Sequence, residues 1–220
     1  MQFQNRAEAA ELLARELAKW RGSNPLVVAI PRGAVPMARI IAERLDGDLD
    51  VVLSRKLGAP GNPEFAIGAV DETGWTYLSD YAQASGASAS YLEREVAAQL
   101  ETMRQRRALY TPARAPFDPA GRVVIVVDDG LATGATMLTA LHAMRDKGAR
   151  HLICAVPVAS PDAIETVRPL ADEVVCLHAP IGFFAISEFY RSFSQVKDDE
   201  VVAILRSAPR RGPAAVLPPA

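Results

Sequence analysis

The sequence has few cysteines, few histidines and almost no net charge. Two cysteines and three histidines among 220 residues supply neither a disulfide framework nor a cluster of Cys and His metal ligands. Both cysteines, Cys154 and Cys176, lie in apolar runs, where a buried free thiol is the usual state. A formal net charge of −2 gives no overall attraction to nucleic acid or to an anionic membrane surface. We therefore expect no polyanionic partner.

Long apolar runs are also missing. No run reaches the roughly 18 residues of a transmembrane helix, and residues 1–20 carry acids and a helical period instead of the basic and apolar regions of a signal peptide. We expect a cytoplasmic protein with no membrane partner. Half of the residues are hydrophobic, which is enough to build a full core, and the length favours one domain.

The most informative stretch is residues 123–136, VVIVVDDGLATGAT. Residues 123–127 are aliphatic on both faces, as in a central strand of a parallel sheet. Asp128 and Asp129 follow at its carboxyl end, where open α/β sheets bind ligands. A loop of small residues with Thr133 and Thr136 then leads into a helix, so backbone N–H groups and hydroxyls can bind phosphate. Acids beside an anion site predict a sugar phosphate, whose hydroxyls donate to the carboxylates.

One other interpretation of this stretch remains open, and two are excluded. Solvated acids at a strand end, with Thr133 as an ordinary helix N-cap, remain an alternative. Two commoner phosphate motifs are excluded, because no lysine follows the second glycine and no GxGxxG follows a strand.

Residues 124–136 resemble the phosphoribosyl-pyrophosphate (PRPP) signature of type I phosphoribosyltransferases: an aliphatic strand, two acids, a short spacer and Thr-Gly-x-Thr. Gly130 stands where an aliphatic residue is usual, and Ala135 where glycine is frequent. The resemblance implies that Asp128 and Asp129 hold the ribose hydroxyls. It also implies that a loop binds the 5′-phosphate, through Ala132, Thr133, Gly134, Ala135 and Thr136.

The resemblance also implies an α/β fold: a single doubly wound, mainly parallel sheet of about five strands, a flexible loop or hairpin and a small C-terminal hood. Alternating strands and helices favour the same class. We expect strands over 26–30, 49–54, 123–127, 152–156 and 173–177, and helices over 6–20, 35–45, 91–109, 137–147 and 161–170. The predicted domain spans 1–205, with the core about 26–178, the hood about 179–195 and a disordered tail over 206–220.

A second loop follows the first strand. Residues 31–34, Pro-Arg-Gly-Ala, lead directly into the helix over 35–45. Arg32 offers a bidentate donor for phosphate, and Gly33 allows unusual backbone geometry; alone, such a sequence is more often a simple turn. Its position resembles the pyrophosphate loop of these transferases, where a sometimes cis peptide presents amides, and this implies a pyrophosphate role for Arg32, Gly33 and Ala34.

Two basic residues precede a loop rich in glycine and proline. Residues 57–65 should form a loop that is ordered only part of the time, followed by a hairpin of 66–70 and 75–78. Such a mobile element closes over PRPP in the resembled family, which makes Lys56, with Arg55 second, a pyrophosphate contact. A solvated basic pair is the alternative.

The helix over 91–109, capped by Ser88 or Ser90, ends near Arg104, Arg106 and Arg107. Favourable interaction with the helix dipole is the ordinary explanation for these arginines. A subunit interface or a phosphate contact from a neighbouring chain is a lesser one. We expect a homo-oligomer, most simply a dimer.

Aromatic residues, only 6% of the chain, gather in residues 179–193. Each could simply cover the core. Because the resembled enzymes place a nucleobase hood here, Phe183 and Phe184 are candidates to stack on the base, with Tyr190 behind them.

The predicted activity is transfer of a phosphoribosyl group from PRPP to a nitrogenous base, with release of pyrophosphate. Asp128, Asp129, Arg32 and Lys56 are the predicted catalytic residues. Mg²⁺ is the expected cofactor, held through PRPP oxygens and water and not directly by protein side chains. A PRPP-binding regulator without catalysis is the alternative, and phosphatase or phosphorolysis activity is a third possibility.

One residue, Ala132, bears on which base accepts the phosphoribosyl group. Ala132 stands where oxopurine transferases often have Asp, which accepts the ring proton, so we expect poor activity with hypoxanthine and guanine. The proton would then leave through Glu188, water or Glu64. That the family tolerates alanine here with any base is nearly as good an interpretation.

Overall fold

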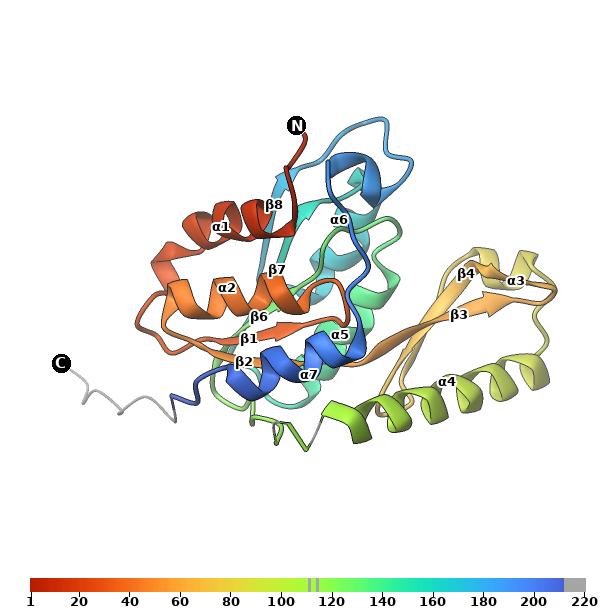
Figure 1. Ribbon diagram of the computed structural model, residues 1–220. Coiled ribbons are helices and arrows are strands. Elements are labelled where there is room, and N and C mark those ends of the chain that lie inside the picture. Colours follow the sequence, from red (N-terminus) through yellow and green to blue (C-terminus); the bar gives the residue numbers. More distant parts are fainter. Residues whose placement is uncertain (111, 114, 212–220) are drawn as a thin grey trace.

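The computed structural model describes residues 1–110, 112–113 and 115–211. Its centre is a five-stranded parallel sheet (Figure 1). The strand order is β2-β1-β6-β7-β8, so the order reverses between β1 and β6. Ligands of doubly wound sheets bind at that point, beyond the carboxyl ends of the strands. The strands are β1 (Leu26–Ala29), β2 (Asp48–Val51), β6 (Val123–Val127), β7 (His151–Val158) and β8 (Glu173–His178).

Helices cover both faces of this sheet. Alternate β6 side chains divide between two cores: Val123, Ile125 and Val127 pack in one, and Val124 and Val126 in the other. This explains why the strand is aliphatic at every position. The first core is closed by α1 (Arg6–Glu16), α2 (Val35–Leu45) and α7 (Asp198–Ser207), and the second by α5 (Ala135–Asp146) and α6 (Pro161–Val167). Short 3₁₀ turns, Ala18–Trp20 and Arg168–Leu170, follow α1 and α6.

A smaller antiparallel unit projects from this body as an arm (Figure 1). Its elements are β3 (Ser54–Ala59), β4 (Asn62–Asp71), β5 (Thr76–Leu78), α3 (Tyr81–Ala84) and α4 (Ala89–Tyr110). The predicted hairpin of 66–70 and 75–78 is confirmed as β4 and β5. The predicted loop over 57–65 is wrong, because residues 57–59 end β3, residues 62–65 begin β4, and the two strands pair as a hairpin. Register shifts around Gly58 and a turn with Gly61 at φ 72° obscure the strand pattern in the sequence.

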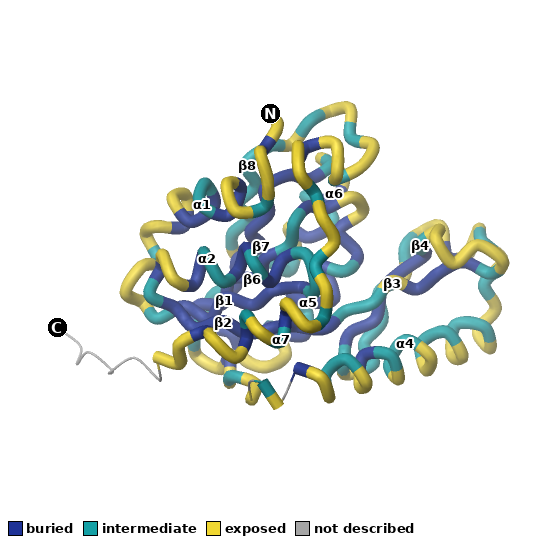
Figure 2. Tube along the Cα trace, in the orientation of Figure 1, coloured by how far each residue is buried: buried dark blue, intermediate teal, exposed yellow. Residues whose placement is uncertain are grey.

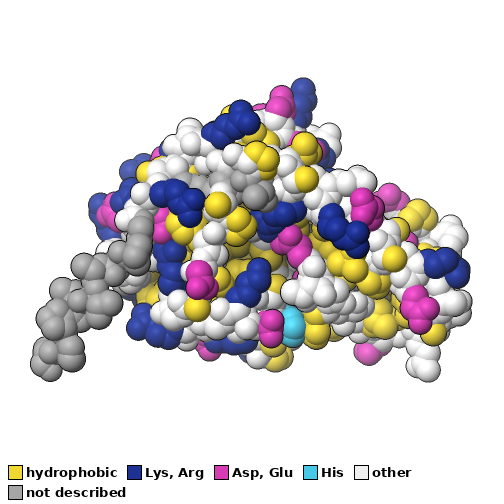
Figure 3. Space-filling view, turned by 90° about the horizontal axis from the view of Figure 1, so that it is seen from below, with side chains coloured by type: hydrophobic (Ala, Val, Ile, Leu, Met, Phe, Trp, Pro, Cys, Tyr) yellow, Lys and Arg dark blue, Asp and Glu magenta, His cyan; other side chains and the backbone are white. Residues whose placement is uncertain are grey.

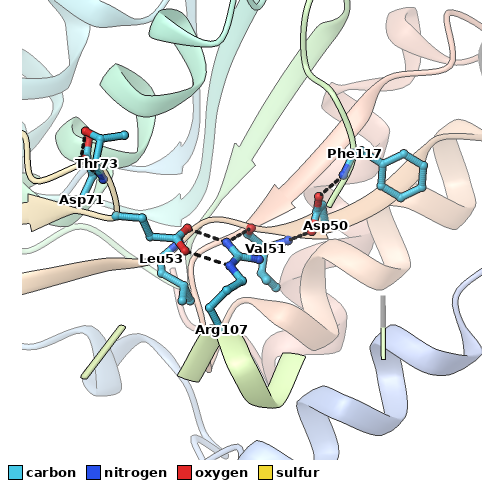
Figure 4. A network of polar contacts seen from close by, with 8 residues as sticks. Asp50, Val51, Leu53, Asp71, Thr73, Arg107 and Phe117 are labelled. Atoms are coloured by element: carbon cyan, nitrogen blue, oxygen red, sulfur yellow. Dashed lines mark hydrogen bonds and ion pairs between the residues drawn. The ribbon is translucent and has the colours of Figure 1, made fainter. Parts of the chain in front are cut away.

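The arm joins the body through a polar network (Figure 4). Arg107 on α4 donates to Glu72 (Nε to Oε1, 2.9 Å) and to the Val51 carbonyl (3.2 Å). Glu72 accepts in turn from the Leu53 N–H at 3.3 Å. Arg107 is therefore a structural ion-pair partner, where the sequence suggested the helix dipole. At the other end of α4, Ser88 caps the helix as expected, accepting from Tyr91 N at 3.2 Å.

The extent of burial differs between the body and the arm (Figure 2). The central strands are buried, whereas the outer face of α4 is exposed. Seen from below, acidic and basic side chains are interspersed on the surface (Figure 3), in keeping with the small net charge. No helix among the described residues has the length and apolar character needed to cross a membrane.

The start of the predicted disordered tail is wrong. Residues 206 and 207 end α7, and the next residues pack on the body. Arg210 lies 4.4 Å from the Phe117 ring centroid, and Arg211 pairs with Asp46 at 2.6 Å. These contacts hold Arg210 and Arg211 against the body beyond the end of α7. The rest of the predicted tail, 212–220, lies outside the described residues.

Candidate active site

The two acids directly follow β6 at the point where the strand order reverses, and each has its own environment. Asp128 is half-buried and its Oδ1 accepts from the Asp129 N–H at 2.8 Å. Asp129 Oδ2 accepts from Arg6 Nε at 2.9 Å and Arg6 Nη2 at 2.7 Å. Burial, reinforced by the Asp129 charge, raises the pKa of Asp128 well above its ordinary value. Burial also raises the pKa of Asp129, against the opposing effect of Arg6.

Arg6 is a site residue that sequence reasoning missed. It is the first residue of α1, a helix expected only to pack on the sheet. Besides Asp129, its guanidinium donates to the Ser194 carbonyl at 2.7 Å and covers the Phe193 ring at 3.8 Å from the centroid. Arg6 therefore joins the N-terminus, a predicted ribose acid and the hood.

The Tyr190 side chain supports the backbone of the same acid, Asp129. Its hydroxyl donates to the Asp129 carbonyl at 2.7 Å, and the residue is only 4% exposed. It packs against Phe3 and Phe193. The sequence places Tyr190 behind the stacking candidates Phe183 and Phe184; its buried ring offers no face to a base.

The loop after the acids has the small residues that its packing requires. A Cβ on Gly130 would lie 2.8 Å from Ile186 Cγ2 and 3.1 Å from Val158 Cγ1. This explains why no aliphatic side chain occupies that position. Gly134, at φ 77°, is the N-cap of α5 and has no capping side chain. The alternative of a Thr133 cap fails, because Thr133 Oγ1 reaches only the Ala135 N–H, at 3.5 Å.

Backbone N–H groups at the start of α5 therefore stay available to an anion. Ala132 and Thr133 are exposed, Thr136 is half-buried, and Ala135 begins the helix. The Ala132 carbonyl is fixed by the Ser160 hydroxyl at 2.8 Å. Ala132 places no acid in the loop.

The second predicted loop lies directly beside the first. The Ile30 N–H donates to the Val127 carbonyl at 3.0 Å, which brings the ends of β1 and β6 together. The Pro31–Arg32 peptide is cis, and Ala34 is the buried N-cap of α2. A Cβ on Gly33 would lie 2.1 Å from Asp129 Oδ2, so only glycine fits against that carboxylate. The structure thus brings Arg32, Gly33 and Ala34 to the acids.

The two basic residues of β3 diverge, because side chains alternate along a strand. Arg55 lines a cavity of about 560 Å³ beside Asp129, together with Arg32, Gly33 and Arg106. Lys56 is exposed, and its charge lowers the pKa of Asp128, against the larger effect of burial. The sequence favoured Lys56, whereas the structure brings Arg55 into this cavity and Lys56 near the other acid.

The hood contributes different residues to the cavity from those expected. Ile186, Phe193 and Val196 line it. Phe183 instead stacks on Phe189, with ring centroids 5.4 Å apart, and Phe184 is 88% exposed. Phe193 belongs to the aromatic cluster that the sequence singled out. Its contact with Arg6, 187 positions away, leaves no local signal.

Comparison with known proteins identifies the family of this chain. A family model described as phosphoribosyl transferase domain matches residues 3–193. A Mycobacterium tuberculosis protein, whose name assigns it provisionally to the phosphoribosyl transferases, is 39% identical over 209 residues, or 94% of this chain and 47% of that protein. The chain thus spans about half the length of the curated relatives it matches.

Two further likenesses differ in extent. The crystal structure of TT1426 from Thermus thermophilus is 48% identical, with a TM-score of 0.79 over 94% of this chain and 98% of that one. A uracil phosphoribosyltransferase of Bifidobacterium animalis is 41% identical over 55 residues only, 25% of this chain and 26% of that protein. By the family match over 3–193 and the identity over nearly all of the chain, the protein belongs to the phosphoribosyl transferase domain family.

Proposed function

We propose that this domain transfers a phosphoribosyl group from PRPP to a nitrogenous acceptor and releases pyrophosphate. One observation carries the proposal. The two acids, the loop 130–136 and the Arg32 loop meet where the strand order reverses between β1 and β6. A ribose with a phosphate at one end and a pyrophosphate at the other needs these three elements together.

In the proposed reaction the bond from ribose C1 to pyrophosphate breaks and a bond from C1 to the acceptor nitrogen forms. Pyrophosphate leaves with the bonding electron pair, and the proton of the acceptor N–H passes to water. Asp128 and Asp129 bind the ribose hydroxyls and stabilise positive charge that develops on the sugar. The loop from Ala132 to Thr136 binds the 5′-phosphate. Arg32, Arg55 and Lys56 offset the negative charge of the leaving pyrophosphate, beside the amides of Gly33 and Ala34.

The residues of this site fit Mg²⁺ as an ion that is held through the substrate and water. Among the described residues no group of three or more His, Cys, Asp or Glu side chains is placed to hold a metal. The carboxylates nearest the substrate are Asp128 and Asp129, and Asp129 is already paired with Arg6. The ion would therefore take its oxygens from PRPP and water, as expected from the sequence. When bound, Mg²⁺ neutralises pyrophosphate charge.

The acceptor is proposed to be a base other than an oxopurine. Ala132 supplies no carboxylate for a ring proton, and the cavity lining includes neither Glu188 nor Glu64. Phe183 and Phe184 remain the proposed stacking residues, and Ile186 and Phe193 add apolar surface within the cavity. The short match to uracil phosphoribosyltransferases makes uracil part of the panel to test.

A steady-state screen of adenine, uracil, hypoxanthine and guanine with PRPP and Mg²⁺, measuring pyrophosphate release, tests the proposal. We expect turnover with at least one base, and the lowest kcat/KM with hypoxanthine and guanine. If hypoxanthine or guanine gives the highest value, the argument from Ala132 is wrong. PRPP binding without turnover or pyrophosphate–PRPP isotope exchange would favour the regulator.

We also propose a cytoplasmic homodimer with a role in nucleotide salvage. The exposed outer face of α4 offers a surface for a second subunit. Light scattering at micromolar concentration measures the oligomeric state, and a monomer there would refute the dimer.

A further inference from the structure

Four arginines line the cavity beside Asp129. Arg6 is paired with Asp129 itself, and the other three come from three separate elements. Arg32 comes from the loop after β1, Arg55 from β3 and Arg106 from α4. Segments 74 residues apart in the sequence therefore converge on one small volume. Arg106 was explained from the sequence by the dipole of α4, but its place in the cavity calls for a different explanation.

Charge compensation among these arginines is incomplete. Asp198, at the start of α7, lies 3.3 Å from Arg32 Nη1 and 3.8 Å from Arg106 Nε, longer than the 2.7–2.9 Å typical of strong charged hydrogen bonds. The same carboxylate accepts from the Tyr110 hydroxyl. Arg55 Nε donates to a neutral acceptor, Gln99 Oε1, at 2.8 Å. Asp198 is thus shared by Arg32 and Arg106, and the Arg55 Nε meets a neutral amide oxygen instead of a carboxylate.

The electrostatic consequence is seen at Arg55. Burial lowers the pKa of Arg55, and the nearby charges of Arg106 and Arg32 lower it further, with Glu95 opposing them. Holding like charges together in a partly buried cavity costs free energy. A multivalent anion between them would recover that cost, and the planar guanidinium forks suit phosphate oxygens.

We propose that Arg106 completes a pyrophosphate subsite, in which Arg32, Arg55 and Arg106 together bind the leaving group of PRPP. The inference rests on the proposed function. The cavity opens on the Arg32 loop and Asp129, which is the side of the ribose where the bond to pyrophosphate breaks. The 5′-phosphate loop belongs to the other side, at the start of α5. Asp198 is the internal carboxylate that positions Arg32 and Arg106 from α7.

Isothermal titration calorimetry of the full chain with magnesium pyrophosphate tests the role of Arg106 directly. Arg106→Met should weaken pyrophosphate binding about tenfold or more, because a hydrogen bond to a charged group is lost. Arg104→Met is the matched control. Arg104 lies on the same helix but is 70% exposed and pairs with Glu101, so its loss should leave the affinity within twofold.

Kinetics separate this role from a structural one. Arg106→Met should raise KM for PRPP and leave KM for the acceptor unchanged, whereas loss of folding would lower active enzyme without that split. Arg106→Lys keeps the charge but not the planar fork, so it should weaken pyrophosphate binding several-fold with an unchanged melting temperature.

The outcomes also separate this inference from the proposed function. If the wild type turns over PRPP but both Arg106 variants bind pyrophosphate as tightly as the wild type, only the role of Arg106 is overturned. If the wild type neither binds pyrophosphate nor turns over PRPP, the proposed function fails as well.

Discussion

Gly33→Ala is the substitution that most directly tests the geometry of the acids. The added Cβ would lie 2.1 Å from Asp129 Oδ2 and 2.9 Å from Arg6 Nη2. To reach an ordinary contact of 3.4 Å, the carboxylate must retreat by about 1.3 Å. Arg6 cannot simply follow, because its remaining nitrogen is bound to the Ser194 carbonyl and its plane lies on Phe193.

Both partners of the displaced ion pair are largely buried, with side chains 13% and 14% exposed. Overpacking at such a site costs about 2 kcal/mol, which lowers the melting temperature of a domain of this size by roughly 4 to 8 °C. The catalytic effect should be larger. A ribose ligand misplaced by about 1 Å costs on the order of a hundredfold in rate.

The measurements are kcat/KM for PRPP, with the best acceptor from the base screen, and a thermal melt followed by circular dichroism. Gly182→Ala is the matched control. Its Cβ would meet nothing within 4 Å, and its backbone is not left-handed, so both quantities should match the wild type. A Gly33→Ala variant with wild-type kinetics and melting temperature would refute the placement of Asp129 against Gly33.

Three further predictions concern the same site. Asp128→Asn should lower turnover by roughly a hundredfold. Burial raises the folded-state pKa of Asp128 above its unfolded value near 3.9. Ionising Asp128 therefore lowers the free energy of unfolding, and the loss is complete above the raised pKa. The variant should melt higher than the wild type at pH 7, and the difference in melting temperature should vanish toward pH 4. Tyr190→Phe leaves the Asp129 carbonyl without its donor and should destabilise by about 1 kcal/mol in a denaturant titration; an unchanged midpoint contradicts this. Gly130→Val should lower the melting temperature through collision with Ile186, and Ile186→Ala should restore part of the loss, which a double-mutant cycle measures.

The fold was largely predictable because its signals are local. An aliphatic run such as 123–127 has the same meaning wherever its neighbours lie, and the strands and helices around it follow from period and spacing. The arm was harder. The strand character of residues 57–65 depends on pairing across Gly61, and glycine and proline there mask the alternation. The order of Arg210 and Arg211 depends on Phe117 and Asp46, which no local pattern reveals.

The candidate site divides in the same way. The acids and both loops could be found because each is a contiguous motif at a strand end. Arg6 and Asp198 could not, since each is the first residue of a helix distant in sequence from both loops and looks like an ordinary surface charge. In the sequence Arg106 is only one of three arginines at the end of a helix, for which the helix dipole is the ordinary explanation. The sequence put Lys56 ahead of Arg55, but the face of β3 that meets the cavity is set by the packing of the arm, which no local pattern reveals.

Gly130 shows how a departure from the family signature becomes intelligible only through tertiary structure. Its missing side chain leaves space that Ile186 fills from the hood, and Ile186 also lines the cavity beside Asp129. The phosphate loop and the hood are therefore packed as one unit, at a contact 56 residues apart. A larger residue at 130 would collide with Ile186, so the choice of glycine there affects the packing of the hood as well as the loop that contains it.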